Sequence, residues 1–466
     1  MICIPITART APEAERDIAL ARDADIIELR LDCLDSVDSR ALERLMSLFS
    51  PVIVTFRGGR VKDEKRLSIL KRALDLGADY IDLDLDLGKD AIKEFLGRRT
   101  KIIVSYHNFR ATPDLSGIYD KIASLGPDII KIATTANRYT DNLKLLNLPA
   151  DKDRIVLCMG QKGLVSRILY RRFNSILTYA SLAPEKESAP GQIPAYELRG
   201  IYRAGGLDAS TQLVGLIGNP VAHSVSYLMH NKMFVDMGLN YVYIPFQVDD
   251  LGDFIAFARQ ICMRGFNVTI PHKIAVMKHL DAVDETAGKI GAVNTVVNDR
   301  GFIGYNTDGT GAVAALRERT RVRGKKILVL GAGGAARAVA YGLVQAGAEL
   351  SIYNRTKEKA DALAGELGCK SGMIDDPDII VNTTSVGMGP DKLTPIDEQK
   401  LKRAIVMDIV FNPMKTRLIR DAEKRGNMAI SGIKMLAYQG AAGFRLWTGK
   451  KPDAGIMESI AMEALK

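Results

Sequence analysis

Reactive side chains stand at or near the ends of several short apolar runs in the first 180 residues. They are Glu28, Arg30, Arg57, His107 and Lys131. A lysine amine can act as a nucleophile, a histidine can transfer protons near neutral pH, and an arginine can hold an anion. These side chains are the first candidates for catalysis, provided that the fold brings the ends of the runs together.

A glycine-rich turn further along the chain could bind a dinucleotide. Gly331, Gly333 and Ala336 fit G-x-G-x-x-G/A directly after the apolar run KKILVL. Glycine permits a tight turn there and lets backbone amides approach a pyrophosphate. A strand-to-helix turn without a ligand is the alternative, but a helix and a second strand follow in order, which favours dinucleotide binding. The residues expected around the phosphates are Gly331, Ala332, Gly333, Gly334 and Ala335.

The end of the next strand indicates which dinucleotide is bound. The sequence there is Asn354-Arg355-Thr356, without the acidic residue that would hold the ribose 2′-hydroxyl of NAD. A guanidinium suits a 2′-phosphate, so NADP is predicted. The alternative is that Arg355 is an ordinary solvated arginine.

The elements that must position the first group of residues alternate regularly. Short β-branched runs are separated by segments with apolar residues at helical spacing, such as 11–24 and 65–77. Eight βα units in succession predict a TIM barrel, which carries its chemistry at the carboxyl ends of its strands. The eight runs are ICIPI, DIIELRL, PVIVTF, DYIDLDL, KIIVSYH, DIIKIA, RIVLCMG and SILTYA.

A stretch rich in Pro, Gly and Ser, residues 181–200, precedes a change in pattern. We place a domain boundary at 205–211, with one domain over 1–208 and another over 211–466. Strands and helices alternate again after this boundary, which predicts a doubly wound α/β unit. A chain of 466 residues is long enough for two or three such cores.

Composition excludes several other classes of protein. The chain is 47% apolar and 26% charged, and it has no apolar stretch that could cross a membrane. Its five cysteines are widely spaced, and its first residues resemble neither a signal nor a transit peptide, so a cytoplasmic location is expected. The net charge of +9 is scattered rather than gathered in a basic arm, which argues against nucleic acid and suits small anionic ligands.

The second half closely resembles shikimate dehydrogenase over residues 213–466. The motifs are GNPVAHSVSYLMHN, FNVTIPHK, GAVNT, GYNTDG, VNTTSVGM and MLAYQGAAGF. The resemblance implies a substrate lobe over 211–312 and 435–466 and an NADP-binding Rossmann lobe over 313–434. It implies that Lys273 and Asp308 are the catalytic pair. The further residues that it implies bind the substrate are Ser224, Ser226, Thr269, Asn294 and Gln439, and Thr383, Thr384 and Ser385 would lie near the nicotinamide.

Two positions depart from that family. Tyr227 stands where a proline is usual, and Phe411 stands where a tyrosine commonly contacts the substrate, which leaves room for a related ring such as quinate. The histidines at 223, 230 and 272 lack H-x-x-x-H spacing, so structural or capping roles are expected and no metal is predicted.

The first half resembles type I 3-dehydroquinate dehydratase over essentially the whole predicted barrel. The motifs are ELR, TFR, SYHNF, KIATTA, MGQKGLVSRIL and SAPGQ. The resemblance implies that Lys131 forms a Schiff base with the substrate ketone and that His107 moves the protons. Lys131 should lie beside apolar neighbours that disfavour its charged form. The residues matching substrate-binding positions are Arg30, Arg57, Arg167, Ser188 and Gln192, with Glu28 as a partner for orientation or ion pairing.

One segment of the barrel departs from its family. After TFR the family usually carries a Glu-Gly-Gly segment whose carboxylate pairs with the catalytic histidine, whereas RGGRVKDEKR is shortened here. Glu64 could supply the carboxylate from a rearranged loop, or the histidine could lack a partner and dehydration would be slower.

The two implied reactions are consecutive. The first yields 3-dehydroshikimate from 3-dehydroquinate, and the second reduces it to shikimate with NADPH, as in aromatic amino acid (chorismate) biosynthesis. The alternatives are a quinate or shikimate dehydrogenase of catabolism, and a noncatalytic ligand-sensing barrel joined to a working dehydrogenase. The sequence does not indicate the oligomeric state.

Overall fold

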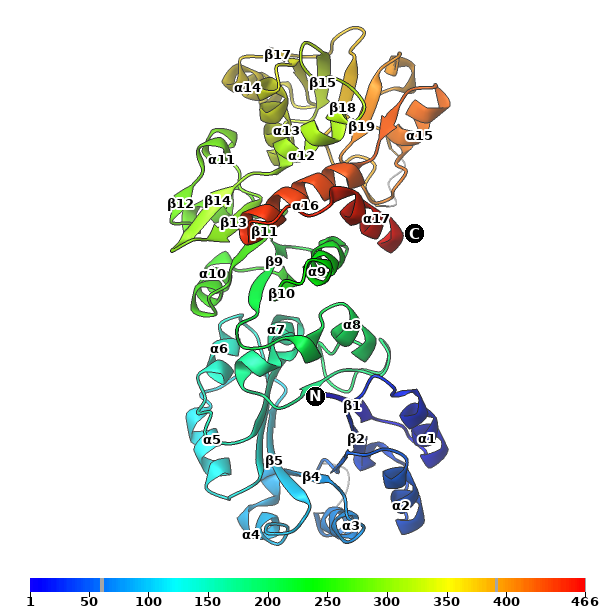
Figure 1. Ribbon diagram of the computed structural model, residues 1–466, viewed down its shortest axis with the longest axis vertical. Coiled ribbons are helices and arrows are strands. Elements are labelled where there is room, and N and C mark those ends of the chain that lie inside the picture. The colour runs from blue at the N-terminus through cyan, green and yellow to red at the C-terminus, as the bar shows by residue number, and fades with distance from the viewer. Residues whose placement is uncertain (59–62, 390–392, 466) are drawn as a thin grey trace. The chain divides into compact units, whose positions relative to one another are not determined.

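The computed structural model describes residues 1–58, 63–389 and 393–465. The chain divides into two compact units (Figure 1). Unit 1 comprises residues 1–211 with 252–261, and unit 2 comprises residues 212–251 with 262–466. No helix in the described part of the chain is long and apolar enough to span a membrane.

Unit 1 is a nearly closed barrel of eight parallel strands, as the eight β-branched runs predict. The hydrogen-bonded order is β7-β6-β5-β4-β3-β2-β1-β8, and β7 and β8, at its two ends, lie next to each other. The strands are β1 (Ile2–Ile6), β2 (Ile26–Arg30), β3 (Val52–Thr55), β4 (Tyr80–Asp84), β5 (Lys101–Asn108), β6 (Ile129–Thr135), β7 (Arg154–Met159) and β8 (Thr178–Tyr179).

Helices follow the strands and surround the barrel (Figure 1). The segment predicted over 11–24 forms a helix that starts at the cap of Thr10, whose Oγ1 accepts from the Glu13 amide, and ends at Leu20. The helices are α1 (Ala11–Leu20), α2 (Ser39–Ser47), α3 (Asp63–Asp75), α4 (Lys89–Lys93), α5 (Ser116–Ala123), α6 (Asp141–Leu146), α7 (Leu164–Ile168) and α8 (Ala195–Gly200).

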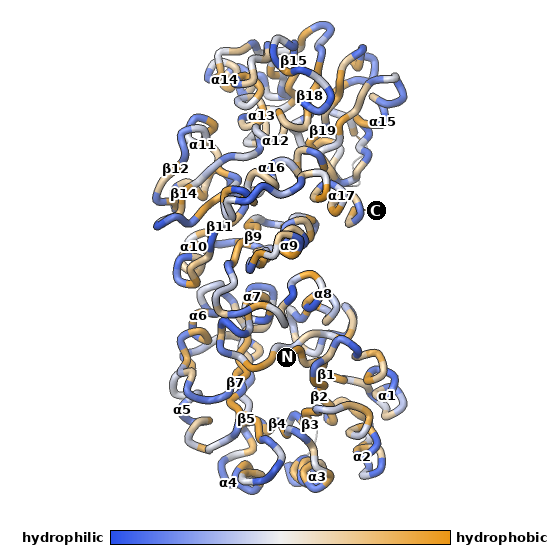
Figure 2. Tube along the Cα trace, in the orientation of Figure 1, coloured by the Kyte–Doolittle hydropathy of each residue, from blue (hydrophilic) through white to orange (hydrophobic). Residues whose placement is uncertain are grey.

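The inside of the barrel is layered because side chains alternate along each strand. An apolar cluster that includes Ile26, Ile53, Ile103 and Ile129 is buried in the barrel. Two residues further along the same strands stand Glu28, Thr55, Ser105 and Lys131, and Asp82 occupies the matching position two residues after Tyr80 on β4. A polar layer therefore lies directly above an apolar one, towards the carboxyl ends of the strands. Figure 2 shows the largely hydrophobic barrel strands against helices of mixed character.

Unit 2 contains two sheets. The first has the order β10-β9-β11-β13-β14-β12 and is mixed, because β13 runs antiparallel to both of its neighbours. Its strands are β9 (Gln212–Gly218), β10 (Tyr241–Gln247), β11 (Gly265–Val268), β12 (Ala282–Val283), β13 (Thr295–Asn298) and β14 (Phe302–Tyr305).

The second sheet is parallel throughout and has the order β17-β16-β15-β18-β19-β20. This is the dinucleotide-binding order, with the first strand at the centre and the crossover beside it. Its strands are β15 (Lys326–Leu330), β16 (Glu349–Tyr353), β17 (Lys370–Ser371), β18 (Ile379–Asn382), β19 (Ile405–Asp408) and β20 (Ala429–Ile430).

Helix packing links the two sheets of unit 2. α12 (Asp308–Arg317) packs against both α13 (Gly334–Gln345) and α16 (Gly432–Thr448). The approach of α12 to α13 is close enough to require glycine, because a Cβ at Gly309 would lie 2.4 Å from Ala338 O. The remaining helices of unit 2 are α9 (Ser226–Asp236), α11 (Glu285–Ile290), α14 (Lys357–Leu367), α15 (Arg417–Lys424) and α17 (Ala454–Ala464), whereas α10 (Leu251–Gln260) falls almost entirely in unit 1.

Two candidate active sites

The carboxyl ends of the barrel strands surround a cavity of about 480 Å³. Residues from several strands and loops reach it because the strands are parallel and all end on one side. The sequence-predicted residues that line it are Arg30, Arg57, His107, Lys131, Arg167, Ser188 and Gln192. Glu28 is buried on β2 and contacts Lys131.

Lys131 is buried on β6 among polar partners. Its Nζ lies 2.7 Å from Asp82 Oδ2, 2.7 Å from the Tyr179 hydroxyl oxygen and 3.4 Å from Glu28 Oε1. The expectation of apolar neighbours is wrong, because the alternation that puts Lys131 inside the barrel also puts Glu28 and Asp82 there. Burial, followed by the nearby acids, raises the pKa of Tyr179 well above its usual value, so the phenol stays neutral.

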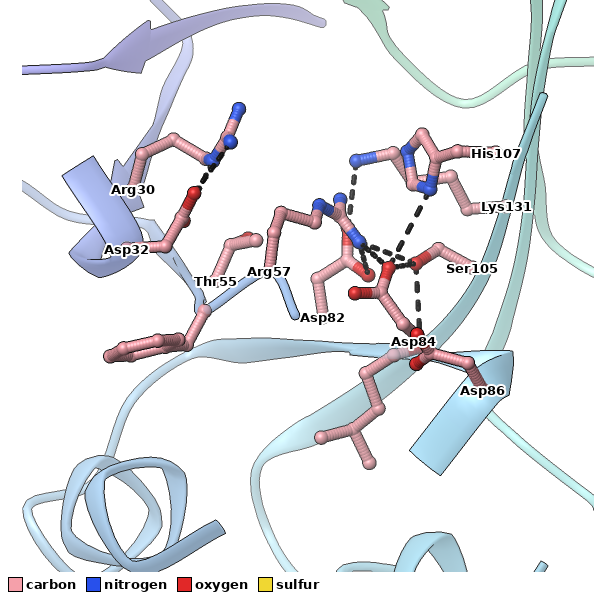
Figure 3. A network of polar contacts seen from close by, with 12 residues as sticks. Arg30, Asp32, Thr55, Arg57, Asp82, Asp84, Asp86, Ser105, His107 and Lys131 are labelled. Atoms are coloured by element: carbon pink, nitrogen blue, oxygen red, sulfur yellow. Dashed lines mark hydrogen bonds and ion pairs between the residues drawn. The ribbon is translucent and has the colours of Figure 1, made fainter. Parts of the chain in front are cut away.

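Two carboxylates of β4, Asp82 and Asp84, bind Arg57 (Figure 3). Its Nη2 lies 2.8 Å from Asp82 Oδ2, and its Nη1 donates to Asp84 Oδ1 and, at 2.7 Å, to Ser105 Oγ. Burial disfavours the charged guanidinium, but Asp82 and Asp84 outweigh that effect and raise the Arg57 pKa. Arg30, at the end of β2, is paired with Asp32 at 2.7 Å.

Arg167, on α7, is a buried cation with unused hydrogen-bonding capacity. Its Nη1 donates to Tyr179 O at 3.3 Å, whereas its Nε and Nη2 have no partner among the described residues. Burial lowers the pKa of Arg167 to about 10, so it is still charged at neutral pH. A buried guanidinium without an acidic partner is suited to bind a carboxylate. Gln192 and Ser188 border the same cavity and hydrogen bond to each other.

His107, at the end of β5, is held in its neutral form. Burial is the main cause that lowers its pKa to about 4, the Arg57 charge adds to the effect, and Asp84 opposes it. A neutral imidazole at physiological pH can accept a proton. The ring stands beside Asp84, while Glu64 is exposed in the first turn of α3. Part of the shortened segment, 59–62, lies outside the described residues.

The residues that sequence reasoning misses in this site are mainly acids. Asp82 and Asp84 belong to DYIDLDL, and both point into the barrel, as Figure 3 shows. The signal for them is the alternation itself, since two acids at successive inward positions of a buried strand need charged partners. Arg66, buried on α3, is one of these partners.

The second site centres on Lys273 and Asp308. Lys273 Nζ lies 2.6 Å from Asp308 Oδ2, and Asp308 Oδ1 accepts from Asn294 Nδ2 at 2.8 Å. Asn294 Nδ2 is also 3.4 Å from Gln439 Oε1 on α16. Four of the predicted residues therefore form one hydrogen-bonded group, in which the amide of Asn294 orients the carboxylate.

Three further residues predicted to bind the substrate lie on neighbouring segments. Ser224 Oγ accepts from the Ser226 amide at 3.2 Å at the start of α9, and Thr269 follows β11. Phe411 and Tyr227 are both partly buried and pack against the apolar core of the first sheet. Within the described residues, no group of three or more His, Cys, Asp and Glu could hold a metal ion.

The predicted cofactor residues meet at one edge of the parallel sheet. The glycine turn follows β15, Asn354-Arg355-Thr356 follows β16, and Thr383-Thr384-Ser385 follows β18, and these three strands are neighbours. Gly331 has a φ of 115°, which favours glycine, and a Cβ there would lie 2.7 Å from Thr383 Oγ1. Gly333, Gly334 and Ala335 form the start of α13, where backbone amides can bind phosphate. Arg355 is exposed.

Both units match known protein families. Residues 2–208 match the family described as Type I 3-dehydroquinase. Residues 216–296 match the shikimate dehydrogenase substrate binding domain, 314–385 the shikimate / quinate 5-dehydrogenase family and 432–462 the shikimate 5′-dehydrogenase C-terminal domain.

Fold and sites together define a two-part enzyme, with a type I dehydroquinase barrel followed by a dinucleotide-dependent dehydrogenase. The chain is 37% identical to the chloroplastic bifunctional 3-dehydroquinate dehydratase/shikimate dehydrogenase of Arabidopsis thaliana, over 96% of this chain and 82% of the relative. The chain belongs to the family of bifunctional 3-dehydroquinate dehydratase/shikimate dehydrogenases, which act in the shikimate pathway.

Solved structures resemble the second unit. A shikimate dehydrogenase in complex with NADP⁺ is 44% identical, with a TM-score of 0.54 over 56% of this chain and 98% of that chain. The enzyme of Thermus thermophilus in complex with NADP(H) and shikimate is 38% identical, with a TM-score of 0.52 over 55% of this chain and 100% of that chain.

Proposed function

We propose that the barrel dehydrates 3-dehydroquinate to 3-dehydroshikimate through a Schiff base on Lys131, and that unit 2 reduces this product to shikimate with NADPH. The observation that carries the proposal is that Lys131 and His107 line one cavity. Arg167 lines the same cavity, and its Nε and Nη2 atoms have no hydrogen-bond partner among the described residues. A nucleophilic amine, a proton acceptor and an anion ligand then face one substrate. A barrel that only senses a ligand would not need the first two.

In the dehydratase, the Lys131 ammonium gives up one proton and its amine attacks the ketone carbon; that proton leaves with the carbonyl oxygen as water, and a C=N⁺ bond to Nζ remains. His107 takes the proton from the adjacent carbon, and the C–H electron pair moves to the nitrogen as an enamine. The pair then returns and expels the hydroxyl group of the next carbon, which leaves as water with the proton that His107 carries. Water finally hydrolyses the Schiff base and restores the amine.

We assign the substrate-binding residues of the barrel from the charge and the existing partners of each side chain. Arg167 is the proposed ligand of the substrate carboxylate, because Nε and Nη2 lack partners among the described residues. The guanidinium of Arg57 already forms ion pairs with Asp82 and Asp84. Its proposed role is therefore to hold these two acids near the substrate. The proposal assigns the ring hydroxyls to Arg30, Ser188 and Gln192, which line the same cavity.

In unit 2, NADPH would supply a hydride to the ring carbonyl carbon when bound. The proposed part of Lys273 is to give its proton to the carbonyl oxygen as the C=O electron pair moves onto that oxygen. Asp308, 2.6 Å from Nζ, holds the Lys273 side chain in place, and a proton from solvent restores the ammonium after each transfer. Asn294, Gln439 and Thr269 would bind the ring hydroxyls, and Ser224 and Ser226 would bind the carboxylate.

The proposed cofactor is NADP(H), without a metal. The start of α13 would hold the pyrophosphate, Asn354, Arg355 and Thr356 the 2′-phosphate, and Thr383, Thr384 and Ser385 would lie near the nicotinamide. The proposed division of labour places substrate binding in 211–312 with 435–466 and cofactor binding in 313–434. All five cysteines are free thiols, which supports a reducing compartment such as the cytoplasm.

One assay tests both halves. Purified protein receives 3-dehydroquinate and NADPH, while dehydroshikimate absorbance and NADPH consumption are followed together. The proposal requires shikimate as the final product. NADPH consumption only when dehydroshikimate is supplied directly would contradict the dehydratase and favour the sensing barrel.

A further inference from the structure

The imidazole of His107 has one carboxylate beside its Nδ1 atom. Asp84 Oδ1 lies 3.6 Å from Nδ1, and both side chains are largely buried, with 13% and 18% of their surface exposed (Figure 3). The two residues end neighbouring strands, since β4 pairs with β5 so that Asp84 stands opposite Ser105. The separation is slightly longer than a hydrogen bond, and such contacts often tighten when a substrate binds.

The Asp84 carboxylate is held on both of its oxygens. Oδ2 accepts from Arg66 Nη2, while Oδ1 accepts from Arg57 Nη1 and from Ser105 Oγ at 3.2 Å. Arg66 is itself fixed, because it is 1% exposed and its Nε donates to Phe56 O at 2.6 Å. Oδ2 is therefore anchored from α3, and Oδ1 is turned towards the histidine.

The other acids near this cavity bind groups other than His107 or are exposed. Asp82 pairs with Lys131 and Arg57, and Glu28 accepts from Thr55 and contacts Lys131. Asp86 is bound to Arg66 at 3.3 Å with 70% of its side chain exposed, and Glu64 is exposed in the first turn of α3. Among the described residues, Asp84 is the carboxylate placed at Nδ1.

We propose that Asp84 is the positioning residue of His107, fixing the ring proton on Nδ1 so that Nε2 is the base that accepts the substrate proton. Figure 3 shows this second ring nitrogen on the Lys131 side of the ring, where the Schiff base would form. The carboxylate also stabilises the imidazolium that exists between proton removal and loss of water. In this chain Asp84 supplies the carboxylate partner that the Glu-Gly-Gly segment provides in the resembling family, and Arg66 anchors it. The inference rests on the proposed dehydratase function.

Electrostatic interactions around the pair support this role. Burial alone would raise the pKa of Asp84, but His107 and Arg57 outweigh it and hold that pKa well below its usual range, so the carboxylate is charged. The charged groups that act on His107 are Arg57 from the segment after β3, Lys131 from β6, and Asp82 and Asp84 from β4. Both cations lower the histidine pKa and both acids raise it.

The kinetic test compares Asp84→Asn with wild type. Loss of the charge should lower kcat for dehydration about 10- to 100-fold, by analogy with the carboxylate partners that orient metal-binding histidines, with KM nearly unchanged. Because Asp84 raises the His107 pKa, the acid limb of the kcat profile should move to lower pH in the variant. Asp84→Glu, which restores the charge, should recover part of kcat.

A second measurement observes the ring itself. The chain has five histidines, so ¹⁵N-labelled imidazoles can be resolved by NMR, and His107→Asn assigns the signal of interest. Wild type should show the proton on Nδ1 at pH 7, and Asp84→Asn should show a mixture of tautomers. A merely structural role for Asp84 would not predict this change.

Three controls separate the possible outcomes. Asp86→Asn removes an exposed acid that shares Arg66 and should keep kcat within about twofold of wild type. Unchanged dehydrogenase activity and borohydride trapping of substrate on Lys131 show that Asp84→Asn is folded and binds. The inference is overturned if Asp84→Asn keeps the wild-type kcat, pH profile and tautomer, or if Asp86→Asn loses as much activity. If wild type itself neither dehydrates substrate nor labels Lys131, the proposed function has failed instead.

Discussion

Lys273 Nζ lies 2.6 Å from Asp308 Oδ2, although the two residues come from different segments of unit 2. Lys273 follows β11, whereas Asp308 begins α12 after the β14 hairpin. The pair is therefore made by tertiary structure, and Asn294 fixes its geometry from the end of the loop before β13.

Lys273→Ala removes the proposed proton donor and should stop the second reaction. General acid catalysis typically contributes about 10² to 10⁴ in rate, so kcat for the reduction should fall by that factor. Dehydratase activity should persist, and dehydroshikimate should accumulate when 3-dehydroquinate and NADPH are supplied together. Product analysis by chromatography checks this, and undiminished shikimate formation would remove Lys273 from the mechanism.

Lys131→Ala removes the proposed nucleophile and should abolish dehydration, since Lys131 is the only lysine among the described residues that line the cavity. Borohydride reduction in the presence of 3-dehydroquinate should increase the mass of the wild-type protein by one reduced adduct and leave the variant unchanged. Reduction of supplied dehydroshikimate serves as the control, because Lys131 lies outside unit 2. An adduct on the variant would place the Schiff base elsewhere.

Arg355→Ser tests the choice of cofactor. A charged hydrogen bond to phosphate is worth about 1.5–3 kcal/mol, and the exposure of Arg355 favours the lower end. KM for NADPH should therefore rise about tenfold while KM for NADH stays nearly constant. Arg323→Ser makes the same charge change before β15, at the other edge of the sheet, and should leave both values alone. Equal effects of the two substitutions would speak against 2′-phosphate recognition.

We expect the buried His230 to make the stability of unit 2 dependent on pH. It is fully buried, neither ring nitrogen has a partner among the described residues, and burial lowers its pKa to about 3. Between that value and about 6.5, the unfolded chain binds a proton that the folded chain does not, so stability falls as the pH falls through this window. The slope is up to about 1.4 kcal/mol per pH unit.

The only tryptophan, Trp447, lies 5.4 Å from the His230 ring and reports unfolding of this unit by its fluorescence. His230→Gln should flatten the slope of unfolding free energy against pH between 6 and 4. His223→Gln, at an exposed histidine, should not. Equal slopes in wild type and His230→Gln would show that His230 does not titrate on unfolding.

The sequence predicts the elements better than the contacts between them. The eight barrel strands are visible because each is a short β-branched run, and alternation along them places Lys131 and His107 on the inner face. The same alternation places Asp82 beside Lys131, which the expectation of apolar neighbours overlooks. Asp84 lies beside His107 because β4 pairs with β5 and because Arg66 on α3 binds the Asp84 carboxylate. The strand pairing and the contact with Arg66 are both tertiary, so no spacing of residues along the sequence predicts them.

The glycine contact between α12 and α13 links two parts of the dehydrogenase. Gly309 follows Asp308, and the backbone that it touches on α13 belongs to the helix that starts at the cofactor turn. A methyl group at residue 309 would push α12 away from α13, and would move the Asp308 carboxylate away from the helix proposed to hold the pyrophosphate of NADPH. The reduction should then be slower although every proposed reacting group was intact, because the contact between α12 and α13 would align the proposed proton transfer with the hydride transfer.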